Sequence, residues 1–435
     1  MLSISSATSE SVNLFNGLTQ RGIRFAHWKS NCRLVQSLEG KTDLDLLIHP
    51  EVRRVFLSES LLELGYKKLL SPPWGAYPDV EDWLGFDHET GNFLHLHIHF
   101  ALVTGIKHVK HLYLPWIDVF FKNLVTDSST GWPIPKPEME AIILFIRISA
   151  KMPYSLWGRK SKDIPPSTKK ELIDLLSKSD IDLFIDLCSE LRLTVPANIR
   201  SSVFQIITEH DDAEILAISE DFYEQVRPYY RKSLLASFLQ STYYKLFLIF
   251  ARYAMPYFGP ISLRKKIVGG GKTIALIGSD GSGKSTLSKD LVKWLSYKLD
   301  SHYLYLGKRP FMISNGKKIW SFTSFFYGGK YRARITRKVL NHYFFIFLIK
   351  KKVKLLRSAS KLKANGSVVV CDRFPQLIIE GINDGMILQN NRESKTAKLE
   401  RNLFYQTVPL EADLVFKLNV SPEVASERKP KHDFG

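Results

Sequence analysis

The chain has 435 residues, of which 45% are hydrophobic and 24% are charged. This is an ordinary globular composition, long enough for two or three domains of about 150 residues each. The formal net charge of +18 favours an anionic partner. Cys32, Cys188 and Cys371 are scattered and odd in number, which excludes a disulfide framework and a cysteine metal cluster and indicates a reducing compartment.

Almost all of the excess positive charge lies in the last part of the chain. Residues 271–435 hold 30 Lys and Arg against 13 Asp and Glu, and no acid stands between Asp300 and Asp372. We therefore expect the basic region 301–371 to meet a phosphorylated small-molecule acceptor, a nucleic acid or an acidic membrane surface. A solvated basic face without a ligand is the alternative. The sequence leaves the oligomeric state open.

The chain shows no sign of export. Its start, MLSISSATSESVNLF, lacks a basic segment followed by an apolar run, so we expect no signal peptide. The most apolar stretches, 246–250 and 343–349, are much shorter than the roughly 20 residues that a membrane span needs. We therefore expect a cytoplasmic protein.

The first elements lead to a pair of carboxylates. Residues 10–22 predict a helix that stops at Gly22, and residues 23–26 predict a strand. A later strand, residues 40–48, places Asp43 and Asp45 on one face, because side chains alternate along a strand. Two carboxylates in that position suit Mg²⁺ carrying a triphosphate, so both are candidate metal ligands.

His95, His97 and His99 alternate on a further strand and face one side of it. Imidazoles suit Zn²⁺ and similar ions. Three such residues spread over about 13 Å, however, so all three cannot reach one ion. We expect one or two of them to line the pocket that Asp43 and Asp45 face, with the rest as hydrogen-bonded structure.

The order helix, strand, polar turn and Asp-x-Asp strand resembles the minimal nucleotidyltransferase fold over residues 8–125. The resemblance implies an α+β domain, expected at residues 1–130, that either transfers a nucleotide or binds one without catalysis. The sequence departs from that family in two ways. Lys29, Ser30 and Asn31 replace the usual Gly-Ser turn, and the third acid expected on a later strand has no obvious counterpart.

Residues 131–265 predict a helical middle region. Pro135, Pro137 and Glu138 open its first helix, and residues 168–193 predict two more. Residues 229–250 form a strongly aromatic helix, and aromatic side chains at helical spacing usually pack in a core, so we expect that here. Residues 263–271 form a linker into the last domain, expected at residues 266–435.

The last domain opens on the pattern G-x-x-x-x-G-K-[ST], with a strand predicted before it and a helix after it. Its glycines permit close approach of the backbone, so that loop amides and the helix N-terminus point at an anion. Lys284 adds a charge for the outer phosphates of ATP, and the Ser285 hydroxyl is suited to Mg²⁺. The candidate ATP-binding residues are Gly278, Ser279, Asp280, Gly281, Ser282, Gly283, Lys284, Ser285 and Thr286.

Strands and helices alternate after this loop, which predicts a parallel sheet wrapped by helices, as in a P-loop NTPase. Asp372 ends a buried strand, where an acid is placed to hold Mg²⁺ or its water. Arg373 follows it and is suited to clamp the acceptor phosphate with two hydrogen bonds. The alternative for Arg373 is an ion pair with Asp372 or Glu380.

The segments GSDGSGKST (278–286), VVVCDRF (368–374) and ADLVFKLNVSPEVASER (412–428) together resemble the thymidylate kinase family. The resemblance implies phosphoryl transfer from ATP with Mg²⁺ to a monophosphate, with Lys284, Asp372 and Arg373 in catalytic roles and Arg428 or Lys429 in the lid. Gly307-Lys308-Arg309-Pro310 replaces the family's acidic acceptor loop, and Phe374-Pro375 follows Asp372-Arg373. The acceptor therefore need not be thymidylate. The family's last strand and helix are also expected to be missing beyond Gly435.

Two further functions remain open at this point. One is an NTPase switch, in which hydrolysis in the last domain drives a partner. The other is a nucleotidyltransferase in which the ATP-binding domain is regulatory.

Overall fold

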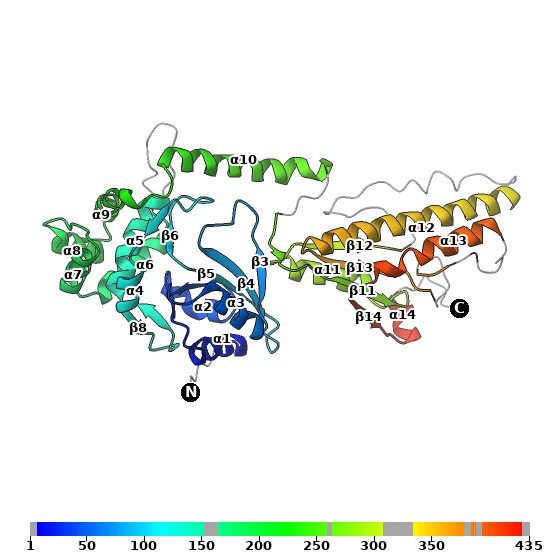
Figure 1. Ribbon diagram of the computed structural model, residues 1–435, viewed down its shortest axis with the longest axis horizontal. Helices are drawn as coiled ribbons and strands as arrows, with labels where there is room; N and C mark the ends of the chain where they lie inside the picture. Colours follow the sequence, from blue (N-terminus) through cyan, green and yellow to red (C-terminus); the bar gives the residue numbers. More distant parts are fainter. Residues whose placement is uncertain are drawn as a thin grey trace. The chain divides into compact units, whose positions relative to one another are not determined.

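The computed structural model describes residues 7–151, 164–258, 263–307, 334–377, 384–386, 388 and 394–428. The chain divides into two compact units, residues 1–254 and 255–435. Figure 1 shows both units.

The sheet of the first unit mixes parallel and antiparallel pairs. Its strands are β1 (Phe25–His27), β2 (Leu44–Ile48), β5 (Phe93–His99), β4 (Val80–Phe86) and β3 (Lys67–Leu70), in that spatial order. Strands β2 and β5 run parallel, and the other neighbours run antiparallel.

Helices α1 (Ser9–Gln20), α2 (Leu34–Leu38) and α3 (Arg54–Glu63) cover one face of this sheet. Leu44, Leu46 and Ile48 of β2 are buried in a core with Leu14 of α1 and Leu57 of α3. Because side chains alternate along a strand, the Asp43 and Asp45 side chains project from the opposite face. The helix and strand predicted for residues 10–26 are confirmed.

Further strands and helices complete the first unit: η1 (Asn31–Arg33), β6 (Leu102–Thr104), β7 (Leu112–Leu114), α4 (Ile117–Lys122), β8 (Leu124–Thr126), β9 (Pro133–Pro135), α5 (Pro137–Lys151), α6 (Pro166–Lys178), α7 (Ile181–Glu190), α8 (Ile199–Glu209), α9 (Asp212–Gln225), η2 (Arg227–Tyr229) and α10 (Leu234–Phe258). Helix α5 is the centre of a second core, which joins Leu47 of β2 to Phe222 of α9. The helical character predicted for the middle region is confirmed. These helices share a core with the sheet of the first unit. The expected domain boundaries at residues 130 and 265 stay predictions.

Helix α10 differs from the expectation for its aromatic residues. Tyr243, Phe250 and Tyr253 are each more than half exposed, together with Leu239 and Leu246 on nearby turns. The prediction that these aromatic side chains lie in a core is wrong, because helical spacing alone does not say whether a partner covers the apolar face. Within the described residues, Leu234–Tyr253 is also long and apolar enough to cross a membrane, judged by length and composition alone. The expectation of no such segment, based on the shorter run at 246–250, is therefore corrected.

The second unit contains a parallel sheet in the order β12 (Ser301–Tyr305), β13 (Val368–Asp372), β11 (Thr273–Gly278) and β14 (Leu414–Leu418). All three neighbouring pairs are parallel. The remaining elements are β10 (Lys266–Ile267), α11 (Lys284–Leu295), α12 (Arg334–Ala364), α13 (Lys395–Tyr405), η4 (Val408–Leu410) and α14 (Pro422–Arg428). The predicted parallel sheet is confirmed, and the assignment to P-loop NTPases stays a prediction.

Strand β13 shows how this sheet is covered. Val369 and Cys371 share a core with Leu356 and Ala359 of α12, the long helix drawn along the sheet in Figure 1. Asp372 therefore projects from the other face, and it is fully buried. The carboxyl ends of β11 and β13 lie side by side, because Leu276 pairs with Asp372.

Candidate functional site

The candidate phosphate-binding loop connects β11 to α11 and contains three glycines with positive φ. Gly278, Gly281 and Gly283 have φ of 145°, 86° and 87°, a conformation that L residues rarely adopt. At Gly281 a Cβ atom would also lie 2.9 Å from the backbone oxygen of Ala425 in α14. The loop therefore needs glycine both for its own conformation and for the close approach of α14.

Lys284 is the first residue of α11, and its side chain turns back into the loop. Its Nζ donates hydrogen bonds to the carbonyl oxygen of Gly278 at 2.8 Å, to that of Ser279 and to the hydroxyl of Ser282 at 3.2 Å. The residue is buried in the structure. Burial, followed by the nearby charge of Arg373, lowers the pKa of Lys284.

Asp372 lies at the end of β13 beside the loop. Its Oδ2 accepts a hydrogen bond from the Tyr303 hydroxyl at 2.7 Å, and the side chain of Ser285 interacts with the same hydroxyl. Burial and the bond to Asp372 raise the pKa of Tyr303. The other carboxylate oxygen, Oδ1, is buried and accepts no hydrogen bond from the described residues. Tyr303 thus links the two residues that the sequence predicts as Mg²⁺ ligands.

Arg373 contacts the loop as well, through Asp280, a candidate ATP-binding residue that the sequence did not suggest as its partner. Its guanidinium donates to Asp280 of the loop and lies 3.5 Å from Asp384. The backbone of Arg373 has φ of 74°, and its N–H donates to the Leu276 carbonyl oxygen at 3.0 Å. The geometry therefore shows the ion-pair alternative, with Asp280 and Asp384 as partners instead of Asp372. Glu380 lies outside the described residues.

A buried lysine of α12 completes the charges around this site. Lys352 interacts with the charges of Asp384, Arg373 and Glu400, and burial lowers its pKa to about 8. The sequence places it in the predicted basic face with Lys350, which is exposed, but Lys352 is turned inward. The sequence did not reveal that Lys352 is buried, because it does not show which face of α12 packs against the rest of the unit.

The remaining predicted residues of this site divide into two groups. Ser285 and Thr286 are exposed in the first turn of α11, and Arg428 is exposed at the end of α14. Lys429 and the segment 308–310, expected in the lid and in the acceptor loop, lie outside the described residues.

The first unit brings Asp43 and Asp45 together with the alternating histidines, as the sequence predicts. The carboxylate of Asp43 lies 2.8 Å from His95 Nδ1 and 3.7 Å from His97 Nε2. Asp45 Oδ1 lies 3.4 Å from His97 Nδ1 and 3.3 Å from His99 Nε2. The Mg²⁺–nucleotide pocket expected here stays a prediction.

Asp82 of β4 is a site residue that the sequence did not reveal. It pairs in register with His97, which pairs in turn with Asp45, so the three residues lie across adjacent strands. Asp82 Oδ1 lies 3.1 Å from His97 Nε2 and 3.3 Å from His95 Nε2. It is an acid on a later strand, where the sequence showed no obvious counterpart of the third acid that the resemblance implies. Its place beside the histidines follows only from the pairing of β4 with β5, which the sequence pattern does not specify.

Lys29, Lys110, Lys151 and Arg147 lie within electrostatic range of one another, and the three lysines interact with the charge of Asp45. Lys29 Nζ lies 2.8 Å from Asp45 Oδ1, and burial lowers the pKa of Lys29 despite that pairing. Lys110 is affected mainly by burial and Lys151 mainly by the charge of Arg147, and the pKa of each is lowered to about 7. Because these positively charged groups repel one another, an anionic ligand bound at this site would be favoured.

The chain was compared with models of known protein families and with solved structures. No model of a known protein family matches the chain. A solved structure, that of an antigenic nucleotidyltransferase-like protein from Paracoccidioides brasiliensis, is similar over 44% of this chain and 97% of its own. The sequence identity is 12% and the TM-score is 0.25. Similarity at that level carries no argument about fold or function.

The second comparison finds relatives by sequence. The chain is 30% identical over 179 residues to the Escherichia coli K12 protein described as "Uncharacterized ATP-binding protein YghR", covering 37% of this chain and 70% of that protein. The protein with the same description from Escherichia coli O6:H1 strain CFT073 matches with the same identity and coverage. The chain belongs to the family of this Escherichia coli protein.

Proposed function

We propose that this protein binds ATP at residues 278–286 and transfers the γ-phosphoryl group to a small phosphorylated acceptor. The observation that carries the proposal is the meeting of the glycine loop with Asp372, whose Oδ1 is buried and accepts no hydrogen bond from the described residues. The description of the related Escherichia coli protein as ATP-binding supports the first half.

The residues present fit a Mg²⁺ ion that accompanies ATP. A buried carboxylate oxygen without a donor is costly unless a cation or a donor meets it, and Asp372 Oδ1 is such an atom. Ser285 interacts with Tyr303 next to it and offers a hydroxyl oxygen, which Mg²⁺ accepts as a ligand. When bound, Mg²⁺ would offset charge on the outer phosphates. Asp372 and Ser285 would hold it.

The chain's own groups supply the rest of the chemistry. The loop amides and the N-terminus of α11 favour the phosphates. Lys284 would exchange its carbonyl partners for a phosphate oxygen, because a charged acceptor binds an ammonium more strongly than a neutral one does. Arg373 holds Asp280 and so fixes the loop. An acceptor phosphate would have to compete with Asp280 for the same guanidinium.

The acceptor class rests on the resemblance to thymidylate kinases and on the charge of the second unit. A nucleoside monophosphate such as thymidylate is the acceptor that the resemblance implies. The basic residues of α12, including the exposed Lys350 and Lys354, would attract such a phosphorylated molecule. Nucleic acid and acidic membrane surfaces remain the other partners that this charge suits.

Incubation with ATP labelled at the γ-phosphate and a panel of monophosphates tests the proposal. Label appearing on one monophosphate, and lost with Asp372→Asn, is the expected result. Label released only as free phosphate would instead indicate an NTPase. In a parallel incubation with ATP labelled at the α-phosphate, label transferred to the acceptor would indicate a nucleotidyltransferase. Either of these outcomes would overturn the proposal.

A further inference from the structure

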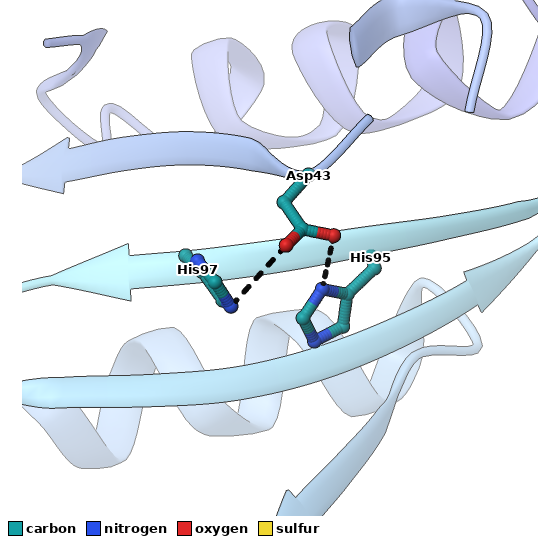
Figure 2. Close-up of side chains that lie close together, drawn as sticks. All are labelled: Asp43, His95 and His97. Atoms are coloured by element: carbon teal, nitrogen blue, oxygen red, sulfur yellow. Dashed lines mark hydrogen bonds and ion pairs between the residues drawn. The ribbon is translucent and has the colours of Figure 1, made fainter. Parts of the chain in front are cut away.

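The face of the first unit's sheet that points away from α1–α3 gathers imidazoles and carboxylates from three adjacent strands. His95 and His97 belong to β5, Asp43 directly precedes β2, and Asp82 belongs to β4. Figure 2 shows the Asp43 carboxylate lying between the two imidazoles, with one oxygen directed at each ring. Residues far apart in the sequence therefore come together at one place on this face of the sheet.

The spacing of the possible ligand atoms suits one ion. Asp43, His95 and His97 each offer one ligand atom, and these three atoms lie within 4.8 Å of one another. Ligand atoms around a tetrahedral ion with bonds of about 2.0–2.2 Å lie roughly 3.3 Å apart. Small rotations of the partly exposed Asp43 and His97 side chains would close that difference. Asp43 and His97 have side chains 32% and 28% exposed, so an ion can reach them from solvent.

Each histidine also has a second carboxylate on its other ring nitrogen. His95 uses Nδ1 toward Asp43, and its Nε2 lies 3.3 Å from the buried Asp82. His97 Nε2 lies 3.7 Å from Asp43 and 3.1 Å from Asp82, and its Nδ1 lies 3.4 Å from Asp45. Histidines that bind metals usually donate the remaining ring N–H to a carboxylate, which fixes the tautomer and the orientation of the ring. This arrangement is present at both histidines.

A second triad, Asp45, His97 and His99, shares His97 with the first. It is the weaker candidate, because Asp45 is already paired with the ammonium of Lys29 at 2.8 Å and His99 is almost fully buried. A cation placed there would meet a like charge. Asp45 is better suited to orient His97 from behind.

We propose that Asp43, His95 and His97 bind a single divalent transition-metal ion of the zinc class, oriented by Asp45 and Asp82. The choice of metal follows from the donor set, since imidazole nitrogen suits Zn²⁺ and similar ions and Mg²⁺ prefers oxygen. Three protein ligands leave a coordination position open, which is the pattern of zinc sites that act on a ligand. The surrounding Lys29, Lys110 and Arg147 favour an anion at that position.

The test uses the full chain, treated with a chelator and then titrated calorimetrically with Zn²⁺, Co²⁺ and Mg²⁺. We expect one Zn²⁺ per chain, Mg²⁺ binding at least about 100-fold weaker, and visible Co²⁺ absorption bands typical of a tetrahedral site. Asp43→Asn and His97→Gln should each weaken Zn²⁺ binding about 100-fold or more, and Asp45→Asn, which changes an orienting partner, about 10-fold.

Three controls separate this site from others. His88→Gln, an exposed histidine outside the cluster, and Lys284→Met, in the phosphate loop of the other unit, should leave Zn²⁺ affinity unchanged. Thermal melting of each variant should match the parent chain. Absence of stoichiometric Zn²⁺ binding, or Zn²⁺ affinity unchanged in both Asp43→Asn and His97→Gln, would overturn the proposal. So would Mg²⁺ binding as tight as Zn²⁺ and insensitive to His97→Gln.

Discussion

The guanidinium of Arg373 donates a hydrogen bond to the carboxylate of Asp280. The residue that follows the end of β13 therefore holds the candidate phosphate-binding loop from the neighbouring strand. Its position depends on a positive φ of 74°, a conformation uncommon for a residue other than glycine. This hydrogen bond joins the loop to the end of β13.

Arg373→Lys should lower stability and weaken ATP binding together, because a lysine keeps the charge but cannot bridge Asp280 and Asp384. We expect a loss of roughly 1–3 kcal/mol in unfolding free energy, less than for removing a buried partner entirely. Arg357→Lys, at an exposed position, is the matched control. If acceptor-dependent transfer alone fell, by about 100-fold, with melting and ATP affinity unchanged, Arg373 would be the acceptor clamp instead.

Asp372→Asn should reduce transfer by about 100-fold or more without lowering the melting temperature. The amide keeps the size of the side chain and removes a buried negative charge whose Oδ1 has no hydrogen bond within the described residues. Tyr303→Phe removes only the hydroxyl next to it and should cost much less activity. Transfer by Asp372→Asn at the parent rate, measured at several Mg²⁺ concentrations, would contradict the assigned role.

Lys350→Glu with Lys354→Glu should raise the KM for the phosphorylated acceptor, and the effect should fade as salt rises. Both side chains are exposed one turn apart on α12, whereas Lys352 between them is buried and should not be reversed. Unchanged kinetics, with polyanion binding that falls steeply as salt rises, would assign this face to nucleic acid or lipid.

We expect the buried His111 to make the free energy of unfolding fall in acid. Its Nδ1 accepts a hydrogen bond from the Ile106 N–H, and its Nε2 lies 2.9 Å from the Tyr223 hydroxyl, so the ring is held neutral. Burial lowers its pKa from 6.5 to about 4. Between those values the unfolded chain binds a proton that the folded chain does not, so stability falls as the pH drops from 6.5 to 4.

The full shift corresponds to roughly 3 kcal/mol. His111→Gln should be less stable at neutral pH, because the packing changes, but should lose less stability between pH 7 and pH 5. Denaturant unfolding at both pH values checks this, with the exposed His88→Gln as the control. Equal pH dependence in the parent and in His111→Gln would contradict the assignment.

Much of the fold could be predicted because local patterns specify it. The strand before Gly278, the strand ending at Asp372 and the parallel sheet between them follow from short buried runs and their order. The alternation of Asp43 and Asp45 placed both on one sheet face, and the structure confirms this placement through their shared contact with His97. The function of these residues stays a prediction.

Features that depend on distant contacts could not be predicted. Asp82 joins the cluster only through the register of β4 with β5, and Asp280 meets Arg373 across strands β11 and β13. The orientation of Lys352 and the exposure of Tyr243 depend on which helix faces are covered. Sequence spacing shows that an apolar or basic face exists, but not what packs against it.

ATP binding to the parent chain and to Lys284→Met is the measurement that tests the central claim most directly. Methionine keeps the length of the buried side chain and removes the ammonium, which donates to the loop carbonyls of Gly278 and Ser279. We predict that calorimetry detects one ATP per chain for the parent and at least about 10-fold weaker binding for Lys284→Met, with similar melting temperatures. Equal ATP affinity in the two proteins would contradict nucleotide binding at residues 278–286.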